Sequence, residues 1–66
     1  MTATIKKELK AKKEQVLVSF QNARSLNTYE GWQNFGALVT QWLNLASSHG
    51  DYKSMEETSF YREKAP

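Results

Sequence analysis

A short stretch in the second half of the chain contains the residue types of a hydrolytic triad. Ser47 and Ser48 supply hydroxyl groups, His49 an imidazole and Asp51 a carboxylate, with Gly50 between the last two. In a working triad these groups converge in space and each makes a specific hydrogen bond. Nearly contiguous residues at a helix end rarely do so. The stretch fits better as a helix C-terminus, where histidine faces the negative end of the dipole and glycine stops the helix.

Other catalytic and metal-binding patterns are also weak. The neighbouring carboxylates Glu56 and Glu57 fit the solvated first turn of a helix better than an acid–base pair. The chain has no cysteine and a single histidine, which excludes thiolate and His-rich metal sites. It has no Gly-rich phosphate loop, H-E-x-x-H pair or calcium loop. We therefore expect a protein that is not an enzyme and that uses no metal and no cofactor.

Positive charge near the N-terminus is the first binding feature. Residues 1–24 carry six basic and two acidic side chains, a local charge of +4, whereas residues 25–66 carry three and five, a local −2. On a helix, at about 100° per residue, four of the basic side chains form a ridge that could bind phosphates. These are Lys6, Lys10, Lys13 and Arg24. The simpler interpretation is a solvated face. No helix has the arginine and asparagine content of a base-reading helix.

An apolar helix is the second binding feature. Between Gly31 and Gly50 the sequence contains no Asp, Glu, Lys or Arg. Aromatic side chains are enriched at binding hot spots, so this helix could anchor a partner. The predicted partner-binding residues are Trp32, Phe35, Leu38, Trp42 and Leu45. The simpler interpretation is core plus a self-dimer interface. A membrane-surface role is unfavoured, because such helices normally carry lysine or arginine on their own polar face.

The spacing of apolar residues predicts two long helices that position these features. A narrow apolar stripe predicts the first helix over residues 4–25, with Thr4 as its N-cap. The stripe consists of Ile5, Leu9, Val16, Phe20 and Ala23. Asn27 can end this helix in a left-handed conformation, and Thr28 can cap the next one. The second helix is predicted over residues 29–48, with Glu30 in its first turn and Gly50 as its stop.

The C-terminal tail is less regular. Ser54 and Glu57 fit an S-x-x-E capping box, which predicts a short helix over residues 55–64. Its apolar residues do not form a clean stripe, so the segment is either a docked third helix or a partly ordered arm. These residues are Tyr52, Met55, Phe60 and Tyr61.

Together these elements predict an all-α fold, with residues 1–66 forming one small domain built on an antiparallel helical hairpin. The apolar arc of the second helix spans about 180°, roughly twice what one neighbouring helix covers. The tail can fold back over it through Tyr52, Phe60 and Tyr61, or a second hairpin can dock to give a four-helix dimer, and the two arrangements are compatible. We favour a homodimer, because so short a chain without disulfides has a marginal core. Gly36 is predicted to admit a neighbouring backbone.

The predicted function is that of a small protein-interaction module, such as an adaptor, assembly factor or inhibitor, which binds a larger protein through the apolar helix. The alternative is a small nucleic-acid-associated regulator that uses the basic ridge. The sequence shows no signal-peptide pattern and no run of about 20 apolar residues, so we expect a cytoplasmic protein.

Overall fold

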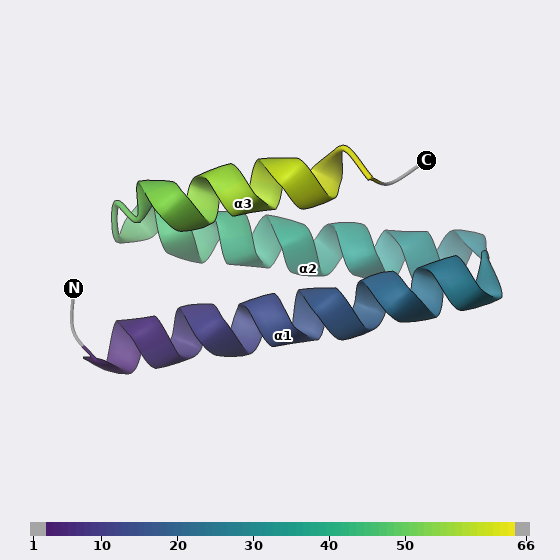
Figure 1. The fold of residues 1–66 in the computed structure, drawn as a ribbon, viewed down its shortest axis with the longest axis horizontal. Helices are drawn as coiled ribbons and strands as arrows, with labels where there is room; N and C mark the ends of the chain where they lie inside the picture. The colour runs from purple at the N-terminus through teal and green to yellow at the C-terminus, as the bar shows by residue number, and fades with distance from the viewer. Residues whose placement is uncertain (1–2, 65–66) are drawn as a thin grey trace.

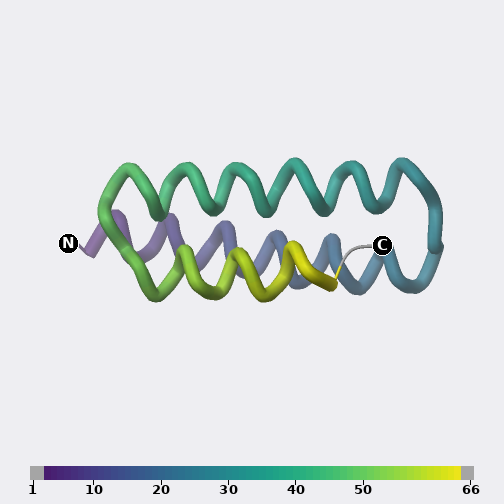
Figure 2. The backbone as a smooth tube through the Cα atoms, turned by 90° about the horizontal axis from the view of Figure 1, so that it is seen from above, coloured from purple at the N-terminus to yellow at the C-terminus, as the bar shows by residue number. Residues whose placement is uncertain are grey.

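Three α-helices form the part of the chain that the computed structural model describes, residues 3–64. They are α1 (Ala3–Leu26), α2 (Tyr29–Ser48) and α3 (Tyr52–Arg62). α1 and α2 form an antiparallel hairpin, and α3 runs back along α2 (Figure 1). α2 packs against both α1 and α3; it lies between them in Figure 1 and to one side of both in Figure 2, so the three helices are arranged as a triangle. The all-α hairpin is thus confirmed, and the tail is a docked third helix.

Two residues connect α1 to α2, and both have the predicted roles. Asn27 has a φ of 49°, in the left-handed region, and its N–H donates to the carbonyl oxygen of Ala23 at 2.7 Å. Thr28 is the N-cap of α2, and its Oγ1 accepts the N–H of Gly31 at 3.1 Å. These local bonds satisfy backbone groups at the turn and explain why α2 begins at Tyr29, as predicted.

α2 also ends at the predicted residue. Gly50 has a φ of 66°, a conformation that favours glycine. The Gly50 N–H donates to Ser47 O at 3.2 Å, and the Asp51 N–H donates to Ala46 O at 2.9 Å. This pair of bonds is the Schellman arrangement, which satisfies carbonyl groups at a helix C-terminus.

Two other predicted helix starts are wrong. α1 begins at Ala3, which places Thr4 inside the helix and not at its N-cap. α3 begins at Tyr52, with Asp51 as its N-cap, so Ser54 and Glu57 do not form the predicted capping box. Instead, the Ser54 hydroxyl donates to Asp51 Oδ2 at 2.7 Å. The tight Gly50 turn lets the next helix start three residues earlier than the S-x-x-E pattern indicates.

The close approach between helices falls at Gly31. A Cβ added there would lie 3.3 Å from Ala23 Cα and 3.0 Å from Thr28 Oγ1. A Cβ added at Gly36 would meet no atom within 4 Å, so the prediction that Gly36 admits a neighbouring backbone is wrong within this chain. Gly31 is the closer position because α2 has only just left the two-residue turn.

The core joins the predicted stripe of α1 to one face of α2. Its buried hydrophobic residues are Leu9, Val16, Ala23, Phe35, Val39, Trp42 and Ala46. Ile5 and Phe20, the other members of the stripe, pack at its edge. Within residues 3–64, none of the three helices combines the length and the hydropathy needed to cross a membrane.

α3 covers part of the apolar arc of α2, and of the three residues predicted to supply this cover only Tyr61 does so. Tyr52 and Phe60 are 79% and 57% exposed. The contacts come from Met55, Thr58 and Tyr61, and the Tyr61 ring lies 6.0 Å from that of Trp42. The chain therefore buries its central tryptophan with its own third helix, and a second hairpin is not needed for that purpose.

Candidate binding surfaces

The five apolar residues predicted to bind a partner fall on different sides of α2. Phe35 and Trp42 are each 1% exposed, which leaves neither accessible to a partner in this fold. Leu38 and Leu45 remain half-buried at the edge of the core. At about 100° per residue, Leu38 lies roughly 60° around the helix from Phe35, and this rotation separates the two pairs.

Trp32 lies at the end of the hairpin. Its ring packs edge-on against Phe20 and Phe35, with ring centres 6.1 and 5.7 Å apart. Its Nε1 donates to Asn27 Oδ1 at 3.3 Å. Trp32 is half-buried, so it belongs partly to the core and partly to the surface beside Arg24.

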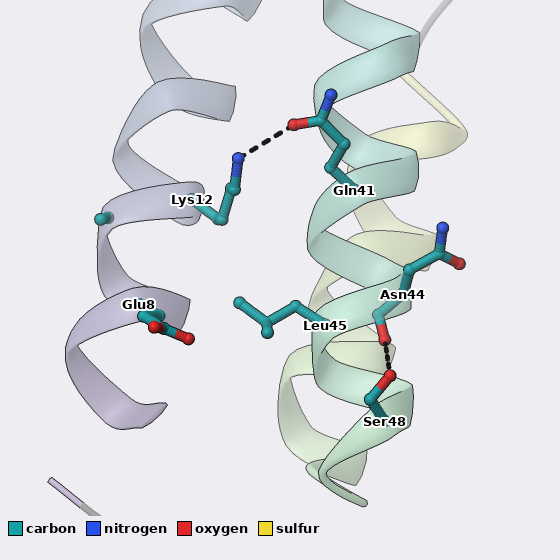
Figure 3. Close-up of a pocket in the computed structure, with 7 residues that line it drawn as sticks. Glu8, Lys12, Gln41, Asn44, Leu45 and Ser48 are labelled. Carbon is teal, nitrogen blue, oxygen red and sulfur yellow. Dashed lines mark hydrogen bonds between the residues drawn. The ribbon is translucent and has the colours of Figure 1, made fainter. Parts of the chain in front are cut away.

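Leu38 and Leu45 line a shallow groove between α1 and α2, which we call the α1/α2 groove. The α1 side contributes Ala11 and Val18, and no residue of α3 lines the groove. Figure 3 shows Leu45 pointing into the space between the two helices. Beside it, Lys12 Nζ donates to Gln41 Oε1 at 2.9 Å and bridges the groove (Figure 3). The hairpin therefore has one side covered by α3 and one side open.

The predicted basic ridge is divided by the fold. Lys6, Lys10 and Lys13 line one cavity between α1 and α3. Arg24 lies in a different pocket, and its guanidinium carbon sits 5.6 Å from the centre of the Phe20 ring. The first cavity gains Lys53 from α3, a residue that the sequence analysis missed. No local signal could have placed it there, because its position depends on how α3 docks.

Lys13 also has a carboxylate partner. Its Nζ lies 2.8 Å from Glu57 Oε2, and this ion pair links α1 to α3. The hydrogen bond to Glu57, supported by that residue's negative charge, raises the pKa of Lys13 above its ordinary 10.5, against the opposing effect of desolvation. Lys13 is therefore less available to an external anion than its neighbours.

We expect Glu57→Gln to lower the free energy of unfolding by less than about 1 kcal/mol at neutral pH, because solvent reaches both side chains, which are 41% and 32% exposed. The folded-state pKa of Lys13 is raised, so the pair stabilises the fold below pH 10.5 and loses this effect as the pH rises through the raised pKa. Urea unfolding of the wild type and of Glu57→Gln, from neutral pH to beyond pH 10.5, measures the difference in their free energies of unfolding. A difference between them that persists unchanged at the alkaline end would contradict the assignment.

Within residues 3–64, the polar side chains of the triad-like stretch make no hydrogen bond to one another. The Ser48 hydroxyl donates to the Asn44 carbonyl oxygen at 2.8 Å. The His49 backbone instead caps the end of α2. Over the same residues, no group of three or more His, Cys, Asp or Glu side chains is placed to hold a metal ion. Comparisons of the chain with protein-family models, with curated proteins and with solved structures found no match.

Proposed function

We propose that this chain is a protein-interaction module that acts by binding and not by catalysis, with the α1/α2 groove as its contact surface. The observation that carries this proposal is the pair Leu38 and Leu45. Both stay partly exposed along one line of α2 after α3 has covered the other side of the helix. Val18, 59% exposed, extends the apolar surface onto α1.

The spacing of the groove suits a helical partner. Leu38 and Leu45 are seven residues apart on α2, and Ala11 and Val18 are seven apart on α1. Such spacing gives two turns between apolar positions, which is the repeat that a packed helix presents to its neighbour. Four amide side chains line the same groove and can form hydrogen bonds with polar groups along the edges of a partner helix. They belong to Asn22, Asn34, Gln41 and Asn44. We infer that the occupant is an amphipathic helix.

A second copy of the chain is the occupant that we propose. Two hairpins packed groove to groove form a four-helix core, with each α3 on the outside. The α1 side and the α2 side of the groove carry apolar residues at the same seven-residue spacing. The α1 side of one copy can therefore pack against the α2 side of the other, which makes the surface self-complementary, as the interface of a two-fold dimer must be. A 66-residue chain also gains from association, because its own core is small.

We expect wild-type protein to have twice the mass of its 7.6 kDa chain at high micromolar concentration, and Leu45→Glu to stay at 7.6 kDa. Each copy loses the burial of one leucine, worth about 1.5–3 kcal/mol, so the dimer dissociation constant rises by at least about tenfold. Sedimentation or light scattering across the micromolar range measures the mass. Circular dichroism should show unchanged helix content, since Leu45 is only half-buried.

Phe60→Glu is the matched control, because Phe60 is 57% exposed on α3 and lies outside the groove. This variant should retain the wild-type mass. If wild type and Leu45→Glu are both monomeric at every concentration, self-association through the groove is excluded. If Phe60→Glu dissociates the protein as effectively as Leu45→Glu, the interface lies elsewhere.

A further inference from the structure

A cavity of about 240 Å³ lies between α1 and the start of α3, and we call it the lysine cavity. Lys6, Lys10 and Lys13 reach it from α1 and Lys53 from α3, together with the carboxylates of Asp51 and Glu57. Four ammonium groups against two carboxylates leave a net charge of +2 around this small space. Folding thus gathers like charges from two helices, and an anion would reduce their repulsion.

Three of the four lysines are available to such an anion. Glu57 pairs with Lys13 at 2.8 Å, whereas within residues 3–64 no ion pair holds Lys6, Lys10 or Lys53. Asp51 Oδ2 accepts the Ser54 hydroxyl at 2.7 Å. The carboxylates that line the cavity therefore leave most of its positive charge without a partner.

Trp42 also lines the cavity, and its indole nitrogen has no partner. The side chain is 1% exposed, and Nε1 is buried with no hydrogen-bond acceptor among the described residues. An indole N–H can only donate, so what it lacks is an acceptor. Buried polar groups are normally satisfied, and this unpaired donor belongs to a side chain that lines the lysine cavity, where a ligand could supply the missing acceptor oxygen.

The N-terminus of α3 adds to the positive electrostatic potential of the lysine cavity. The side chain of its N-cap residue, Asp51, accepts no backbone N–H of the helix, and Asp51, Lys53 and Ser54 all line the cavity. The first N–H groups of a helix have no partner inside it, and the positive end of the dipole favours an anion there. The negative charge of Asp51 opposes the binding of an anion at this end of the helix.

We propose that the lysine cavity binds a phosphate group carried by a small molecule or free in solution, with Lys6, Lys10 and Lys53 as its charged partners and the Trp42 indole N–H as its buried donor. A doubly charged phosphate balances the net charge of +2. A space of about 240 Å³ holds one such group and not a length of polynucleotide. The cavity faces away from the α1/α2 groove, so this proposal does not depend on self-association.

Nuclear magnetic resonance of the two indole N–H groups tests the site without removing Trp42 from the core. Inorganic phosphate is titrated into the labelled protein, with chloride keeping the ionic strength constant. The Trp42 signal should shift and saturate, because its N–H gains an acceptor. Trp32 is the internal reference, since its N–H already donates to Asn27 and its signal should stay in place.

Charge variants then identify the partners. Lys10→Gln and Lys53→Gln should each weaken phosphate binding by about tenfold, the effect of losing a charge-assisted hydrogen bond. Asp51→Asn should strengthen it, because the amide oxygen can still accept from Ser54 while the repelling charge is gone. Lys7→Gln is the matched control, since Lys7 lies on α1 but does not line the cavity, and it should leave binding unchanged.

The source of the phosphate is read from two further titrations, with a nucleoside monophosphate and with a sugar phosphate. Tighter binding of an ester than of inorganic phosphate assigns the site to a phosphorylated small molecule, and the reverse assigns it to free phosphate. The proposal is overturned if the Trp42 signal does not move. It is also overturned if Lys7→Gln weakens binding as much as Lys53→Gln, or if only duplex DNA binds, with a steep dependence on salt.

Discussion

Replacing Trp42 by alanine is expected to lower the free energy of unfolding by about 3–5 kcal/mol, the cost of emptying a large core position. Trp42 is the largest fully buried side chain and contacts α3 through Tyr61. A chain of 66 residues has a total stability of only about 3–10 kcal/mol. The variant should therefore lose a large fraction of the total stability.

Urea unfolding followed by circular dichroism measures this loss, and Trp32→Ala is the matched control. Trp32 is half-buried at the end of the hairpin, so its removal should cost clearly less. An equal loss for the two variants would show that Trp42 is not the centre of the core. The result also bears on function, because a binding defect in a Trp42 or Phe35 variant would report unfolding and not a lost contact.

Replacing Gly31 by leucine should destabilise the fold by about 1–3 kcal/mol, in spite of the better helix propensity of leucine. Its Cβ would lie 3.3 Å from the backbone Cα of Ala23, which cannot turn away as a flexible side chain would. It would also press on Thr28 Oγ1, the atom that caps α2. Relieving the contact must move α1 and α2 apart beside their two-residue turn.

Gly36→Leu is the control for this prediction, since it makes the same chemical change on the same helix. A Cβ at Gly36 meets nothing within 4 Å, so leucine there should raise the free energy of unfolding by up to about 1 kcal/mol through helix propensity. Chemical denaturation of both variants compares them directly. If the two variants changed stability in the same direction, a tight contact at Gly31 would be ruled out.

Local signals in the sequence were sufficient to predict the bounds of α2 completely and those of α1 to within one residue at each end. Thr28 and Gly50 act through bonds to residues three to five positions away, so their effects can be anticipated from neighbours alone. The start of α3 could not be predicted as well. A Ser–Glu pair resembled a cap, but the turn after Gly50 needs only Asp51 before the next helix begins.

The candidate sites were harder to predict, because they depend on rotation and docking. Phe35 and Leu38 are both apolar and three residues apart, yet one is in the core and the other lines the α1/α2 groove. Which of them is covered depends on the angle at which α2 meets both neighbours. Lys53 joins the α1 lysines only because α3 packs where it does. No pattern within one helix contains that information.

The central position of α2 makes the three helices unequal in how far their sequences can drift during evolution. Both α1 and α3 pack against α2, so a substitution at a buried position of α2 can disturb its packing against both neighbouring helices. This fits its long run without a charged residue, from Gly31 to Gly50. α3 is held by Met55, Thr58 and Tyr61 and by the ion pair of Glu57 with Lys13, whereas positions such as Tyr52, Glu56 and Phe60 are exposed. A new specificity can therefore arise on α3 or on the outer face of α1 while α2 stays nearly constant.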